Sequence, residues 1–254
     1  MLLVGNGKVI TRDEALPYLE DGAVLLDGEA VREVGPLAEL KTKYPGAEFV
    51  DARGGVIMPG LINVHTHIYS GLARGLSIDG FNPTNFFEVL DGQWWYIDRH
   101  LTLDGTRASA YATVLDCIRD GVTTIFDHHA SFCEIPGSLF AIKDVCQELG
   151  IRANLCYEVS ERDGEEKCRQ AIRENADFAR WAKEQDDDMI KAMFGGHALF
   201  TISDKTFEEM VKANDGMTGF HIHVAEGMND VYDSLQNYGC RPVNRLLYNG
   251  ILGE

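Results

Sequence analysis

From about residue 60 onward, short apolar runs alternate with segments whose apolar residues recur at helical spacing. This alternation predicts a βα series with a parallel sheet. Apolar positions in 139–149 follow a helical period and stop before Gly150, which is typical of a helix C-terminus. The expected strands cover residues 61–64, 122–127, 151–157, 189–194 and 218–224.

The intervening segments predict helices of different lengths. Ser203 precedes the apolar positions Phe207 and Val211, so we expect it to be a helix N-cap. Residues 165–185 predict a long, charged and exposed helix, and the first crossover, residues 82–120, is long enough for two helices.

The first 59 residues follow a β pattern instead. Asp27-Gly28 stands between the apolar runs 23–26 and 30–34, which is a strong hairpin signal. Further expected elements are a short helix over 37–44 and strands at 48–50 and 55–58. We therefore expect a small β unit that ends at Pro59-Gly60.

Two closures of the parallel sheet compete, an open doubly wound sheet and a barrel. No dinucleotide fingerprint G-x-G-x-x-G follows any expected strand, which weakens the doubly wound alternative. A barrel places its chemistry at the C-terminal strand ends, and ionisable residues gather there. These residues are His65, His67, His128, His129, His197, His221, His223 and Glu226.

His65-Thr66-His67 ends the first of these strands. Residues i and i+2 of a strand point to the same side, so both imidazoles project together. Two ring nitrogens about 2.0–2.1 Å from a common point bind zinc or a similar metal. The alternative is a pair of polar residues in a loop after the strand.

The segment around His223 completes the pattern. His221 and His223 share one face of the fifth strand, and Glu226 follows just beyond its end. A carboxylate beside a metal-activated water can transfer a proton to a leaving group. His221 would lie one layer deeper than His223, so we favour a structural role for it.

Composition and charge limit the partners. The chain has 254 residues, is 45% apolar, and carries a formal charge of −17. Such a surface repels phosphates, so neither nucleic acid nor a membrane surface is expected as a partner. A small neutral or cationic substrate is compatible with this charge.

The chain shows no targeting signal. No apolar run approaches the roughly 18 residues of a membrane span, and the first residues lack the features of a signal peptide. The six cysteines are scattered without a C-x-x-C pair, so we expect reduced thiols and a cytoplasmic protein.

Three stretches together resemble the amidohydrolase superfamily: 56–67 (VIMPGLINVHTH), 71–75 (GLARG) and 221–226 (HIHVAE). Within it, they are similar to the chlorohydrolase and aminohydrolase group, and most of all to the aminohydrolases called SsnA. The resemblance implies a (β/α)8 TIM-type barrel over residues 60–254. It also implies that residues 1–59 are part of a composite β-sandwich domain.

The resemblance assigns roles to individual residues. His65, His67 and His223 match the metal ligands, Glu226 matches the catalytic proton shuttle, and His197 matches a substrate-contacting histidine. The implied reaction is hydrolysis of a non-peptide carbon–nitrogen bond by a metal-activated water. One divalent transition metal is implied, either zinc, which we favour, or ferrous iron.

The family that the chain resembles also has a histidine on the sixth strand and an aspartate on the eighth strand of its barrel. Residues 61–254 hold five βα units, whereas a barrel needs eight. We therefore expect the chain to be the N-terminal part of a longer enzyme. An open sheet has an exposed edge, so a homo-oligomer is among the expected partners.

For several of these residues, and for the function itself, the sequence allows a second interpretation. We expect His128 and His129 to contact substrate, with helix-start hydrogen bonding as the alternative. For Trp94 and Trp95 we favour core packing over a stacking surface.

The second candidate function is a catalytically incomplete chain that binds metal. A dinuclear relative fits less well, because the fourth strand ends in Gly195-Gly196-His197 without a bridging lysine.

Overall fold

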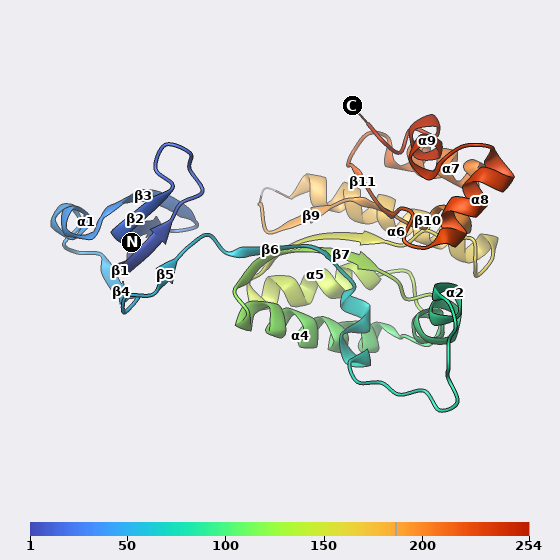
Figure 1. The fold of residues 1–254 in the computed structure, drawn as a ribbon, viewed down its shortest axis with the longest axis horizontal. Coiled ribbons are helices and arrows are strands. Elements are labelled where there is room, and N and C mark those ends of the chain that lie inside the picture. Colours follow the sequence, from blue (N-terminus) through green and yellow to red (C-terminus); the bar gives the residue numbers. More distant parts are fainter. Residues whose placement is uncertain (186, 254) are drawn as a thin grey trace. The chain divides into compact units, whose positions relative to one another are not determined.

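The computed structural model describes residues 1–185 and 187–253. It divides into two compact units, which we call the N-terminal unit (Met1–Leu61) and the larger unit (Ile62–Glu254) (Figure 1). Among the described residues, no helix combines the length and the apolar character that crossing a membrane requires.

The N-terminal unit is a five-stranded mixed sheet with one helix. The strand order is β3-β2-β1-β4, and β5 pairs with β1. Its small core consists of Leu3, Ala23, Leu25 and Leu40. Its elements are β1 (Leu2–Ile10), β2 (Tyr18–Asp27), β3 (Ala30–Pro36), α1 (Leu37–Lys43), β4 (Glu48–Asp51) and β5 (Val56–Ile57).

The hairpin prediction is confirmed, because β2 and β3 pair antiparallel with Asp27 opposite Ala30. The sequence analysis named no strand over β1, which contains Gly5-Asn6-Gly7, a tripeptide typical of a turn. In the structure this tripeptide forms an irregularity within a strand, with Asn6 at φ 59°. That this sheet belongs to a larger β-sandwich stays a prediction.

The larger unit alternates strands and helices. Strands β6, β7, β8 and β9 are neighbours in chain order, and β10 pairs in parallel with β11 (Figure 1). β7 and β8 also pair in parallel. The strands are β6 (Leu61–Thr66), β7 (Val122–His129), β8 (Arg152–Tyr157), β9 (Ile190–Ala192), β10 (Phe194–Ala198) and β11 (Phe220–His223).

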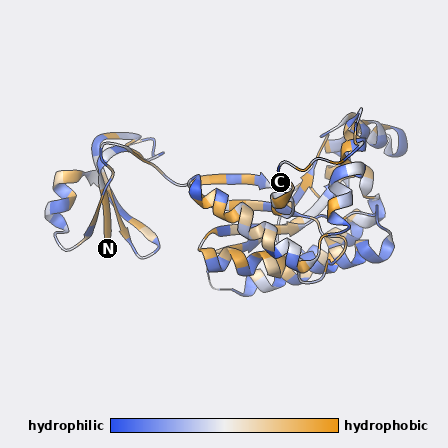
Figure 2. Ribbon diagram, turned by 90° about the horizontal axis from the view of Figure 1, so that it is seen from below, coloured by the Kyte–Doolittle hydropathy of each residue, from blue (hydrophilic) through white to orange (hydrophobic). Residues whose placement is uncertain are grey.

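Helices pack against these strands and bury their apolar faces, so their ribbons carry both hydrophobic and hydrophilic turns (Figure 2). The helix ends follow the sequence signals: Gly150 ends α5 in the left-handed conformation, and Ser203 caps α7 by accepting from Thr206 N. The α-helices are α2 (Phe86–Val89), α3 (Trp95–Asp98), α4 (Leu103–Arg119), α5 (Ser138–Leu149), α6 (Glu165–Glu184), α7 (Asp204–Asn214), α8 (Met228–Tyr238) and α9 (Pro242–Tyr248).

The predicted fourth strand, residues 189–194, is divided in two. β9 continues the sheet beside β8, and β10 begins after Met193 and pairs with β11. The buried side chain of Asn175 joins the two sheets: its Oδ1 accepts from Tyr157 N and Gly195 N, at 2.9 and 3.0 Å. Its amide donates to Tyr157 O, so backbone groups without a strand partner are still satisfied.

Strand β6 is at the end of its sheet and exposes apolar side chains. Ile62 is 59% exposed and Val64 is 70% exposed, which is unusual for a barrel strand. Among the described residues, β6 is thus an edge strand, the kind of strand with which another can pair.

Gly195 allows β10 to approach β8. A Cβ at this position would overlap the carbonyl oxygen of Tyr157, whereas a Cβ at Gly219 would meet only Met193 Cε at 3.7 Å. We predict that Gly195→Ala lowers the free energy of unfolding by about 1–3 kcal/mol, because the backbone must shift.

Chemical denaturation of both variants measures this effect. Gly219→Ala is the matched control and should stay within about 0.5 kcal/mol of the wild type. Equal stability of the two variants would contradict the close approach of β8 and β10.

Candidate metal centre

The Nε2 atom of His223 approaches the Nε2 atoms of two further histidine rings, which stand at the end of β6. His223 Nε2 lies 3.3 Å from His65 Nε2 and 3.3 Å from His67 Nε2. In a tetrahedral site with metal–nitrogen distances of about 2.0–2.1 Å, two ligand nitrogens are about 3.3–3.4 Å apart. Both separations therefore fit ligands of a single zinc-sized ion.

The other ring nitrogen of each histidine has a partner. His67 Nδ1 lies 2.7 Å from the carbonyl oxygen of His128, and His223 Nδ1 lies 2.8 Å from that of His197. A carbonyl only accepts, so both Nδ1 atoms donate and both Nε2 atoms keep a lone pair. His65 Nδ1 instead lies 2.9 Å from His221 Nε2.

Burial favours the neutral imidazole at two of these histidines, the form that metal binding requires. It lowers the pKa of both His65 and His223. Burial also lowers the pKa of His221 to about 3.

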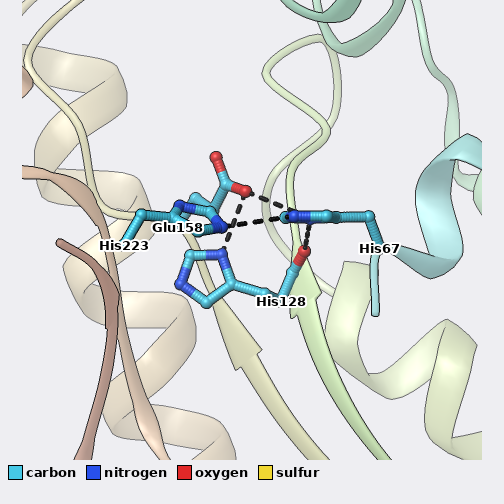
Figure 3. Close-up of side chains that lie close together, drawn as sticks. All are labelled: His67, His128, Glu158 and His223. Carbon is cyan, nitrogen blue, oxygen red and sulfur yellow. Dashed lines mark hydrogen bonds and ion pairs between the residues drawn. The ribbon is translucent and has the colours of Figure 1, made fainter. Parts of the chain in front are cut away.

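Glu158 is the residue that the sequence prediction missed. It follows β8 directly and is only 3% exposed. Its Oε1 lies 3.0 Å from His128 Nδ1 and 3.4 Å from His67 Nδ1, as Figure 3 shows. The signal that could have found it is its place at a strand's C-terminal end, the criterion that selected the histidines.

The charges around Glu158 decide its ionisation. Burial alone would raise the pKa of its carboxyl, but His197, His128 and His67 together lower the pKa well below the usual range. The guanidinium of Arg162, whose Nη1 lies 3.8 Å from Oε2, places a positive charge beside the carboxyl. Glu158 is therefore a buried carboxylate beneath the histidines.

His128 and His129 lie below the site and are fully buried. His128 Nε2 lies 3.0 Å from the carbonyl oxygen of His221, and His129 Nε2 lies 2.9 Å from Ser131 Oγ. The structure thus gives both rings partners within the protein. Contact between these two histidines and a substrate stays a prediction.

A second set of ligands overlaps the first. One potential ligand atom from each of His67, His128, Glu158 and His223 lies within 4.8 Å of the others, close enough to hold a metal (Figure 3). Two observations favour His65 over His128 as a ligand. Both nitrogens of His128 already have partners, and Glu158 approaches His67 at Nδ1 rather than at the convergent Nε2.

Glu226 stands on the rim of the centre. The residue before it, Ala225, has φ 55°, which turns the chain sharply after β11. Ala225 N donates to Asp230 Oδ2 at 2.6 Å and fixes this turn. Partial burial raises the pKa of the Glu226 carboxyl, which suits a group that exchanges protons.

A cavity of about 170 Å³ opens beside the histidines. Its aromatic members include Trp95, which is 6% exposed, so this ring both packs in the protein and lines the cavity. His197 is also buried there and contacts Thr201 Oγ1 through Nδ1 at 2.8 Å. The lining residues are His67, Tyr69, Ser70, Phe86, Leu90, Trp94, Trp95, Glu158, His197, His223 and Glu226.

Comparison with known proteins identifies the class. Residues 56–247 match the amidohydrolase family, and this chain belongs to it. Residues 22–47 match an imidazolonepropionase-like composite domain of bacteria.

Two curated proteins that the chain resembles are named as deaminases. The chain is 30% identical over 253 residues to 5'-deoxyadenosine deaminase of Methanosarcina barkeri, covering 99% of this chain and 55% of that protein. It is 26% identical over 251 residues to 5-methylthioadenosine/S-adenosylhomocysteine deaminase of Thermoanaerobacter pseudethanolicus, covering 98% and 55%. The chain thus spans about half the length of these relatives.

Solved structures show the same fold. Atrazine chlorohydrolase TrzN from Arthrobacter aurescens TC1, complexed with zinc, matches with a TM-score of 0.82 at 24% identity. The match covers 99% of this chain and 58% of the TrzN chain. A zinc-bound adenosine deaminase from Xanthomonas campestris has a TM-score of 0.77 at 24% identity, with 99% and 55% covered. The chain has the α/β amidohydrolase fold, a partial barrel preceded by a mixed sheet.

The two ligand sets predict different variant behaviour. We predict that His65→Ala weakens zinc binding at least 10-fold because one Nε2 ligand is lost. His128→Ala should retain zinc more tightly than His65→Ala, because it removes only a supporting ring.

Competition with a chromophoric chelator measures both dissociation constants. The exposed His100, whose Nδ1 contacts Tyr96 O, supplies the control variant His100→Ala. Zinc affinity that falls more in His128→Ala than in His65→Ala would favour the set that contains Glu158.

Proposed function

We propose that this chain carries the main part of a metal-dependent aminohydrolase site that deaminates a small heterocycle or hydrolyses an amide. The convergence of His65, His67 and His223 beside Glu226, over one aromatic-lined cavity, carries the proposal. The family supports it, since its curated relatives are named as deaminases.

The donor set fits one divalent metal. Three neutral imidazoles with an open position suit zinc, and ferrous iron is the alternative. Both solved structures compared above contain zinc. The metal, when bound, supplies hydrolytic chemistry by activating water at neutral pH.

The protein's own residues would position the substrate and move a proton. Glu226, on the rim of the cavity, would take a proton from the attacking water and deliver it to the departing amine. The buried His197 would contact the substrate from the cavity wall, and the rings of Trp94 and Trp95 offer flat surfaces to a heterocycle.

The relatives' names suggest the substrate class. 5'-Deoxyadenosine and 5-methylthioadenosine are adenine nucleosides altered in the sugar, so such nucleosides form the first panel to test. The narrower assignment to the SsnA group rests on the stretches 56–67, 71–75 and 221–226. For that group we propose no particular substrate.

A second candidate function is metal binding without turnover. The described residues offer three convergent imidazoles, whereas the family pattern adds a sixth-strand histidine and an eighth-strand aspartate. The exposed apolar edge at Ile62 and Val64 favours association with another copy or with a further polypeptide.

The proton-transfer role of Glu226 is tested by substitution. We predict that Glu226→Gln slows ammonia release from the adenosine panel by about 10²–10⁴-fold, because the carboxylate that moves the proton is lost. Zinc affinity should change little, since Glu226 is not among the convergent ligands.

The assay uses the zinc-loaded 254-residue chain, and the exposed Glu208→Gln is the matched control. Undiminished turnover in Glu226→Gln would contradict the assigned role. No ammonia release from any panel member by the zinc-loaded wild type would contradict activity of this chain and support metal binding without turnover.

A further inference from the structure

We propose that His221 is a positioning residue for the metal centre, whose ring holds His65 in the orientation and tautomer that direct Nε2 toward the metal. The proposal rests on the ligand set of the proposed function. From the sequence we expected His221 to have a structural role, whereas this proposal gives it a role in the metal centre.

His65 differs from the other two ligands in how it is held. The Nδ1 atoms of His67 and His223 contact main-chain carbonyls, which every residue provides. His65 is solvent-exposed, and its Nδ1 contacts a side chain, His221 Nε2, at 2.9 Å. The ring centroids are 5.1 Å apart with an interplanar angle of 66°.

The direction of this hydrogen bond follows from the chemistry. A metal ligand needs a lone pair at His65 Nε2, so the proton of a neutral His65 must be on Nδ1. His65 Nδ1 then donates, and His221 Nε2 must accept. The neutral His221 therefore carries its own proton on Nδ1.

The main chain of His221 is held by His128. Its carbonyl oxygen accepts from His128 Nε2 at 3.0 Å, and His128 Nδ1 contacts the buried Glu158 at 3.0 Å. In β11, His221 is in register with Gly195 of β10. A network of contacts thus connects the buried Glu158, through His128 and the partly buried His221, to the most exposed ligand.

His221 is not a fourth ligand in this arrangement. Its Nε2 faces His65 Nδ1, while the convergent atoms are the Nε2 atoms of the other rings. Partners of this kind orient a ligand ring and fix its tautomer, and their loss costs about 10–100-fold in metal affinity.

Two substitutions separate positioning from packing. His221→Phe keeps a planar ring but removes the acceptor, whereas His221→Gln keeps an oxygen that can accept from His65 Nδ1. We expect zinc binding 10–100-fold weaker in His221→Phe and largely restored in His221→Gln, with His100→Phe as the exposed control.

The second measurement needs no metal. Long-range ¹H–¹⁵N correlation spectra of the metal-free protein report which nitrogen of His65 carries the proton. We expect the Nδ1–H tautomer in the wild type and in His221→Gln, and its loss in His221→Phe.

The outcomes distinguish the two proposals. Wild-type protein that shows the Nδ1–H tautomer at His65 but binds no zinc would contradict the proposed function alone. An Nε2–H tautomer in the wild type, or unchanged zinc affinity and tautomer in His221→Phe, would overturn the role of His221. The wild-type spectrum decides this even where His221→Phe does not fold.

Discussion

The proposed site depends on the close approach of three imidazole nitrogens, with His223 Nε2 3.3 Å from the Nε2 atoms of His65 and His67. Lone pairs at this separation repel unless a cation or a proton lies between them. The two strands that carry these rings are far apart in the sequence, since His65 and His223 are 158 positions apart. The fold must therefore hold β6 and β11 in a fixed relation, although they belong to different sheets.

Burial of polar groups below the rings provides this fixed relation. Asp127 Oδ1 accepts from Ile68 N at 2.7 Å and anchors the chain just after His67. Burial raises the pKa of Asp127 to about 7, and the carboxylate of Glu158 is buried close by. Burying such groups is costly unless they are hydrogen-bonded, so the network constrains which arrangement of the strand ends is stable.

The sequence predicted what local patterns determine. Helical spacing before Gly150 and the cap at Ser203 both reappear in the structure, because they depend on neighbours within a few residues. Long-range features were not predictable in this way. Asn175 bridges β8 and β10 where residues 189–194 divide into two strands, and no local motif marks that division. Glu158 stands at a strand end, which marks it as a candidate, but its contacts are with rings from other strands.

The most direct test of the convergent site is a crystal structure of the zinc-loaded chain with anomalous diffraction at the zinc edge. We expect one zinc ion per chain, with the Nε2 atoms of His65, His67 and His223 about 2.0–2.1 Å away. Zinc bound instead between His128 and Glu158, with His65 Nε2 outside its coordination, would contradict the account.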